Sequence, residues 1–152
     1  MATNGSKFGI GWVALCVALG VHIVDEALTG FLSVYNPTVL TIREKIPWFS
    51  MPVFEFKVWL TGLIVAEILL LSLAPFAFRG FRWMRPIAYV FAIVMLGNGL
   101  GHTLGTILGR TVESVHFPRP MPGFYSSPLL VAASIYLFLQ LRRTRHSPIR
   151  PT

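Results

Sequence analysis

Four stretches of this sequence are long and apolar enough to cross a lipid bilayer as helices. A membrane-spanning helix needs about 20 mostly apolar residues, and residues 8–32, 53–78, 84–108 and 127–141 meet that requirement. Turn-forming residues separate them: Asn36-Pro37 and the prolines of 47–52, then Arg79-Gly80 and Pro86, then the proline-rich stretch 118–128. The pattern predicts an all-α membrane protein in which one domain, residues 1–152, forms a bundle of four transmembrane helices.

The composition favours a bilayer over water as the solvent. Hydrophobic residues make up 54% of the chain and charged residues only 12%, too few to cover the surface of an ordinary soluble domain. The net charge of +7 is divided among short clusters between apolar stretches, so membrane lipid is expected as a partner and nucleic acid is not. Cys16 is the only cysteine, which excludes an intramolecular disulfide and a thiolate metal cluster. We expect a multi-pass protein of the cell membrane.

The distribution of basic residues predicts the orientation of the helices. Short cytoplasmic loops carry an excess of Lys and Arg. Eight basic residues fall on one predicted side: Lys7, Arg79, Arg82, Arg85, Arg142, Arg143, Arg145 and Arg150. Five fall on the other: Arg43, Lys45, Lys57, Arg110 and Arg119. Both termini are therefore predicted to be cytoplasmic.

Glycines recur every four residues in the third apolar stretch, at Gly97, Gly101, Gly105 and Gly109. Such a stripe lets a neighbouring helix approach closely. We expect tight helix packing on this stripe, either inside the bundle or in a homodimer.

Ionisable and amide side chains interrupt the apolar stretches in three places. They are His22, Asp25 and Glu26 in the first stretch, Glu67 in the second, and Asn98 and His102 in the third. A charge at membrane depth costs at least about 2.5 to 3.5 kcal/mol, so each requires a partner or a function. Residues four apart share a helix face, which pairs His22 with Glu26 and Asn98 with His102. With a rise of about 1.5 Å per residue, these two pairs come to the same depth, and Glu67 lies about one turn nearer the cytoplasm.

Two short motifs resemble those of a known family. Segment 22–26, His-Ile-Val-Asp-Glu, resembles the name-giving motif of the HXXEE family, small bacterial proteins predicted to have four membrane helices. Segment 98–102, Asn-Gly-Leu-Gly-His, followed by Pro122-Gly123, resembles a second motif of that family. The sequence departs from the family pattern at Asp25, where Glu is usual, and at Tyr125, which follows the Pro-Gly pair. The resemblance implies a four-helix architecture and candidate site residues, and it implies no reaction.

Two kinds of chemistry suit this group of residues. In the first, His22, Glu26, Glu67 and His102 bind one or two ions of zinc, iron or manganese. In the second, the same carboxylates and imidazoles, with Asp25 and Asn98, act without metal as general acids and bases. Nucleotide cofactors are not expected, because the glycines lie inside a span and do not follow a strand.

We therefore expect a membrane enzyme acting on a lipophilic small molecule: an isomerase, cyclase, hydrolase or metal-dependent oxidoreductase. A proton or metal-ion transporter and a non-catalytic protein with structural polar contacts are the alternatives. The transporter is less favoured because residues 10–19 contain no ionisable side chain. Glu113 and His116 fall in the third connection, where we expect a solvated loop.

The predicted orientation can be tested by thiol labelling. In a variant lacking Cys16, a cysteine introduced between Arg79 and Arg85 should resist an impermeant thiol reagent in intact cells, because that loop is predicted to be cytoplasmic. A cysteine between Arg43 and Lys45 should react. The reverse pattern would invert the topology.

Overall fold

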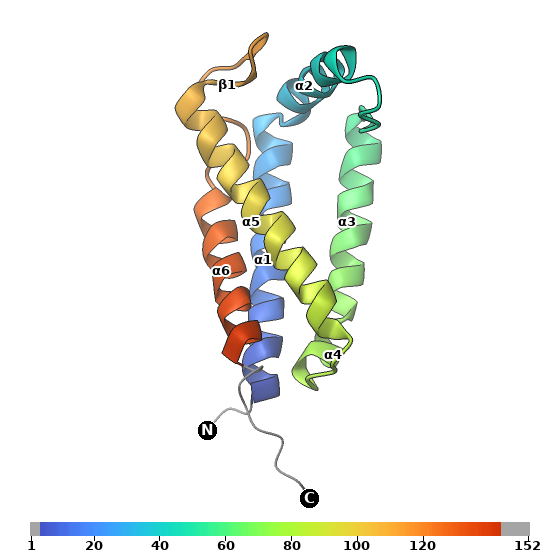
Figure 1. Cartoon of the computed structure of the whole chain (residues 1–152), viewed down its shortest axis with the longest axis vertical. Coiled ribbons are helices and arrows are strands. Elements are labelled where there is room, and N and C mark those ends of the chain that lie inside the picture. The colour runs from blue at the N-terminus through green and yellow to red at the C-terminus, as the bar shows by residue number, and fades with distance from the viewer. Residues whose placement is uncertain (1–3, 144–152) are drawn as a thin grey trace, which may run out of the picture.

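The computed structural model describes residues 4–143 and is mostly helical. Its helices are α1 (Asn4–Thr29), α2 (Leu32–Lys45), α3 (Phe56–Ser72), α4 (Ala74–Phe78), α5 (Met84–Leu108) and α6 (Ser127–Arg143). Two short strands, β1 (Arg110–Val112) and β2 (Val115–His116), form an antiparallel hairpin. Helices α1, α3, α5 and α6 run lengthwise, α4 lies at one end, and α2 and the hairpin lie at the other (Figure 1).

Three segments are long and apolar enough to cross a membrane: Ser6–Thr29, Phe56–Phe78 and Met84–Leu108. These coincide with the first three predicted spans. The fourth predicted span, residues 127–141, corresponds to α6, whose 17 residues lie at the lower limit of length for a crossing. Many large apolar side chains on the lengthwise helices are exposed, which is the surface that hydrocarbon solvates.

The first helix ends earlier than the apolar pattern predicts, at Thr29 and not at residue 32. Gly30 has φ +76°, a left-handed conformation that glycine adopts without steric cost. The amide of Phe31 then donates to the carbonyl of Glu26 at 3.0 Å, as in a Schellman motif. The chain turns here and starts α2.

The first connection contains a helix that the proline signals did not predict. Asn36-Pro37 was interpreted as a break, yet Pro37 lies inside α2, where it removes one backbone hydrogen bond. The side chain of Asn36 makes two tertiary bonds beside this proline: its Nδ2 donates to the Phe54 carbonyl at 2.9 Å and its Oδ1 accepts from the Phe54 amide at 3.0 Å. These two bonds anchor α2 to the segment that leads into α3.

The third connection is also more ordered than a solvated loop. It forms the β1–β2 hairpin, with Glu113 and His116 exposed as expected. Thr41 Oγ1 and Ser114 Oγ are 3.2 Å apart, and a hydrogen bond also joins Thr38 to Thr111. The hairpin thus holds α2 across the end of the molecule.

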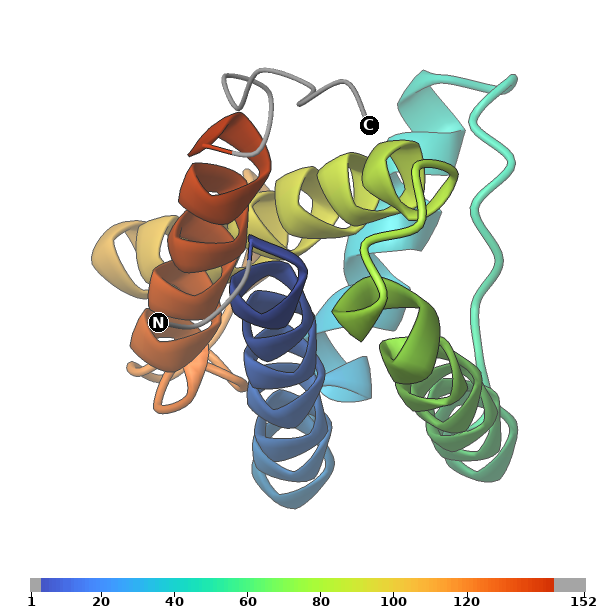
Figure 2. The ribbon, with the colours of Figure 1, turned by 90° about the horizontal axis from the view of Figure 1, so that it is seen from below.

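Helix α1 is central to the packing, as the view along the bundle shows (Figure 2). It contacts α6 on one side and α3 and α4 on another, while α5 packs mainly on α6. Trp12, Leu15 and Cys16 are fully buried in the apolar core. By contrast, only 6% of the apolar 18-residue stretch within Phe56–Phe78 is buried, against 56% for the one within Ser6–Thr29, so α3 presents most of its surface to the surroundings.

The expectation of close packing on the glycine stripe inside this chain is wrong for two of its members. A Cβ added at Gly97 or Gly101 would meet no atom within 4 Å, whereas one added at Gly99 would lie 2.7 Å from Val131 Cγ2 and 3.1 Å from the Ser127 carbonyl. Gly99 therefore makes the close contact between α5 and α6. Gly105 contacts the third connection and Gly109 caps α5.

This rotation of α5 predicts unequal effects of leucine substitutions. Gly99→Leu should destabilise the detergent-solubilised protein by at least the 1–3 kcal/mol typical of overpacking, because backbone of α6 blocks the added side chain. Gly101→Leu should melt close to wild type, since its side chain enters open space. Thermal melts of both variants check this, and equal melting temperatures would show that α5 is rotated differently.

Candidate metal centre

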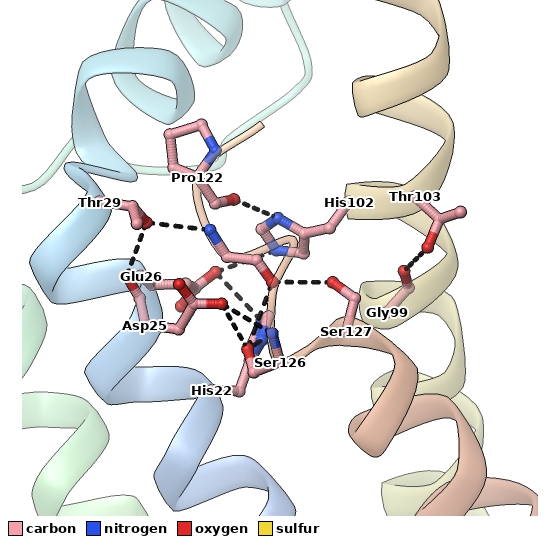
Figure 3. A network of polar contacts seen from close by, with 11 residues as sticks. His22, Asp25, Glu26, Thr29, Gly99, His102, Thr103, Pro122, Ser126 and Ser127 are labelled. Carbon is pink, nitrogen blue, oxygen red and sulfur yellow. Dashed lines mark hydrogen bonds and ion pairs between the residues drawn. The ribbon is translucent and has the colours of Figure 1, made fainter. Parts of the chain in front are cut away.

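Three of the predicted residues meet at the end of the bundle beneath α2. His22 and Glu26 come from successive turns of α1 and His102 comes from α5, and all three are buried (Figure 3). Glu26 Oε1 lies 3.4 Å from His22 Nε2 and 3.1 Å from His102 Nε2. The two imidazole rings meet edge to face, with centroids 4.7 Å apart. One carboxylate oxygen thus faces both rings.

His22 is oriented by a serine that itself binds Asp25. His22 Nδ1 is 2.7 Å from Ser126 Oγ, and the Ser126 hydroxyl and amide both donate to Asp25 Oδ2 at 2.8 Å. Since the hydroxyl proton is directed to the carboxylate, Ser126 Oγ accepts from His22 Nδ1–H. Asp25, which faces inward and does not join the three residues, holds His22 through Ser126.

The 122–123 backbone orients His102. His102 Nδ1 donates to the Pro122 carbonyl at 2.5 Å, because a carbonyl can only accept. The next residue, Gly123, has φ +83°, and a Cβ there would lie 2.7 Å from His102 Cε1 and 2.9 Å from Glu26 Cγ. Its amide donates to Thr29 Oγ1 at 3.0 Å. Only glycine allows the connection to pack this closely on the side chains of His102 and Glu26.

These bonds assign the same tautomer to both imidazoles. Each Nδ1 carries the proton, so in the neutral rings both Nε2 atoms present lone pairs. Both lone pairs are directed at a carboxylate oxygen, and His22 Nε2 has no hydrogen-bond partner among residues 4–143. Three acceptor atoms that converge in a buried volume repel one another unless a proton or a metal cation lies among them.

The spacing of the three atoms suits a metal ion. Two ligands at about 2.0–2.1 Å from a tetrahedral zinc are about 3.3 Å from each other, close to the observed 3.4 and 3.1 Å. One ligand atom from each of His22, Glu26 and His102 lies within 4.8 Å of the other two. An Nδ1–H bond to a carbonyl or hydroxyl is also the usual support of a metal-binding histidine. This cluster could hold a metal.

The structure places the two other predicted residues outside this cluster. Glu67 lies on α3 against Gly20 of α1, in an apolar groove, and its Oε2 has no partner within residues 4–143. Asn98 lines a cavity beside His102, one turn deeper along α5. In the described part of the chain its side chain makes no hydrogen bond. Glu67 does not belong to the group of mutually close ligand atoms.

Sequence reasoning did not identify Ser126 as part of the site. It lies 104 positions from His22, and a serine pair before a proline, as in residues 126–128, is an ordinary helix-start signal. No periodicity or spacing connects such distant segments.

Comparisons with known proteins assign no family: no family model, no curated protein and no solved structure matches the chain. The site is therefore interpreted from its own geometry.

Ser126 and Ser127 provide a matched pair for testing the contacts that orient His22. Ser126→Ala would leave the buried His22 Nδ1–H without a partner, at about 1–3 kcal/mol, and would remove the hydroxyl bond to Asp25 Oδ2, which keeps its bond from the Ser126 amide. Ser127→Ala would remove a single bond to the Gly123 carbonyl, at about 1 kcal/mol. Ser126→Ala should therefore lower the melting temperature more, and a larger effect of Ser127→Ala would contradict the assigned network.

Proposed function

We propose that this chain is a multi-pass enzyme of the cell membrane, with a metal ion bound by His22, Glu26 and His102, that acts on a lipophilic small molecule. The observation that carries the proposal is the convergence of two Nε2 lone pairs and one carboxylate oxygen, with both tautomers fixed by other residues. Structural hydrogen bonding alone would pair each acceptor with a donor.

Four membrane crossings with cytoplasmic termini form part of this proposal. The start of α1 and the end of α6 lie at the same end of the molecule (Figure 1), as an even number of crossings requires. Arg142 and Arg143 extend from that end, whereas Arg145 and Arg150 lie outside the described residues. The excess of basic residues there supports a cytoplasmic assignment, and the metal centre then lies in the outer half of the bilayer.

Two imidazoles and one carboxylate suit several metals. The set is used by catalytic zinc sites and by non-haem iron(II) sites, and manganese also accepts carboxylate. Three protein ligands leave coordination positions free for water or substrate. A bound ion would act as a Lewis acid or lower the pKa of a bound water. The chain holds the ligands in place, because Ser126 and Pro122 fix the two rings and Gly123 closes the site.

A cavity beside the centre supports a lipophilic substrate. It has a volume of ≈ 350 Å³, His102 is in its wall, and most of its lining is apolar. Below His22, toward the predicted cytoplasmic side, Trp12, Leu15 and Leu19 are buried in the apolar core. That packing closes the site toward the predicted cytoplasmic side. It therefore supports an enzyme over a transporter, which would need a pathway through the bundle.

Membership of the HXXEE family is proposed on the motif residues alone. Its two motifs and the Pro-Gly pair lie far apart in the sequence, yet Glu26 contacts both His22 and His102, and Pro122 and Gly123 lie against His102. Such a meeting supports the resemblance.

Elemental analysis tests the metal. Protein purified without chelator should contain zinc, iron or manganese near one equivalent per chain, and Glu26→Gln or His102→Ala should remove it, because three ligands act as a set. Ser126→Ala should weaken metal affinity about 10–100-fold, as loss of a supporting contact does. Glu67→Gln is the control, since Glu67 lies outside the cluster and its loss should leave the metal content unchanged.

Two outcomes would contradict the proposal. Metal-free protein that still converts or retains a lipophilic molecule would favour proton transfer by Glu26 and the histidines. Metal-free protein in which Glu26→Gln raises the melting temperature would leave a structural role for the buried carboxyl.

A further inference from the structure

The cavity beside His102 has two chemically different ends. At one end its wall is formed by Gly97 and Gly101 of α5, and at the other by Thr38 of α2 with Arg110 and Thr111 of β1. From Gly97 to the end of α5 at Leu108 the wall extends about 16 Å, at about 1.5 Å per residue. Because α5 is a candidate membrane span, the glycine end lies within the hydrocarbon and the Arg110 end at its boundary.

The glycine end offers room for a chain. Gly97 and Gly101 have no atom within 4 Å of an added Cβ, so the surface there is a shallow channel. Leu100 and Leu104, both exposed on α5, flank it. A slender apolar chain would fill the channel and restore the contacts that the missing side chains leave unmade.

The boundary end is basic. Arg110 is exposed and has no ion-pair partner among residues 4–143, and the guanidinium of Arg119 lies beside Gly109. No residue in the cavity wall is acidic. An anion at this end would bind one or both guanidinium groups through charge-assisted hydrogen bonds.

We infer that the cavity binds a single-chain amphiphile with an anionic head group, such as a carboxylate or phosphate, whose chain lies along Gly101 and Gly97. A volume of ≈ 350 Å³ is at the small end of the usual range for ligand pockets, about 300–1,000 Å³, which suits one chain and not a two-chain phospholipid. Resting on the proposed function, this names the substrate class: the chain would pass His102 about 9 Å from the Leu108 end of α5.

Photolabelling in lipid nanodiscs tests the inference. The probe is hexadecanoate carrying a diazirine in its chain, and its cross-links should map to residues 97–108 of α5 and to α2. Gly101→Leu should reduce labelling at least about tenfold by filling the channel, the loss expected when a good ligand contact is removed. Gly62→Leu, also a glycine with open space around its Cβ but on α3, should label like wild type.

A substitution of Arg110 tests the binding of the anionic head group. Arg110→Gln should weaken hexadecanoate about tenfold, as loss of a charge-assisted bond does, and should leave the uncharged analogue hexadecanol unaffected. Unlabelled hexadecanoate and 1-palmitoyl lysophosphatidate are each used to compete with the photolabel. The one that competes at the lower concentration identifies the preferred head group as a carboxylate or a phosphate. Equal weakening of hexadecanol would overturn the role of the charge.

Metal analysis of the same samples separates this inference from the proposed function. Gly101→Leu should keep its metal while losing the amphiphile, and wild-type protein that binds the amphiphile without metal would refute the proposed centre alone. Unchanged labelling of Gly101→Leu would mean that the probe reports bulk lipid and would overturn the inference. Absent labelling in wild type, with a dimer that Gly101→Leu converts to monomer, would assign the channel to a second copy of the chain.

Discussion

A carboxylate buried in a bilayer-embedded bundle is stable only if positive charge or hydrogen-bond donors surround it. Glu26 is 5% exposed and faces two imidazole nitrogens, so the end of the molecule beneath α2 is organised around it. The turn at Gly30 lies one helical turn beyond Glu26, and Gly123 covers it from the opposite side. Gly123 belongs to the connection before α6. Contacts with the single side chain of Glu26 therefore join that connection to α1 and α5.

The polar contacts around Glu26 form two layers with different roles. The inner layer consists of His22 and His102, and the outer layer consists of Asp25, Ser126 and the Pro122 carbonyl. The outer layer satisfies both Nδ1–H groups and leaves both Nε2 atoms facing Glu26 Oε1, so a proton or a metal cation is needed among these three atoms. The hydrogen-bonding pattern thus leaves the Nε2 atoms available to a proton or a metal ion.

The long helices could be predicted from the sequence because a bilayer demands apolar runs of fixed length. Three of the four predicted spans coincide with candidate spans within a few residues. The structure of the connections could not be predicted, because α2 contains a proline that normally signals a break in a helix. Helix α2 is stabilised instead by the bonds between Asn36 and Phe54 and by its contacts with the hairpin. Those are tertiary contacts, which override local propensity.

Helix periodicity identified His22, Glu26 and His102 because residues four apart share a face and counting residues gives depth. The same counting placed Glu67 near them, but depth does not determine the rotation of a helix about its axis. Rotation of α5 depends on Gly99, where Val131 and Ser127 of α6 approach most closely. That contact directs His102 toward Glu26 and leaves Gly97 and Gly101 uncovered, so one close approach between α5 and α6 positions both the His22, Glu26 and His102 cluster and the open surface beside it.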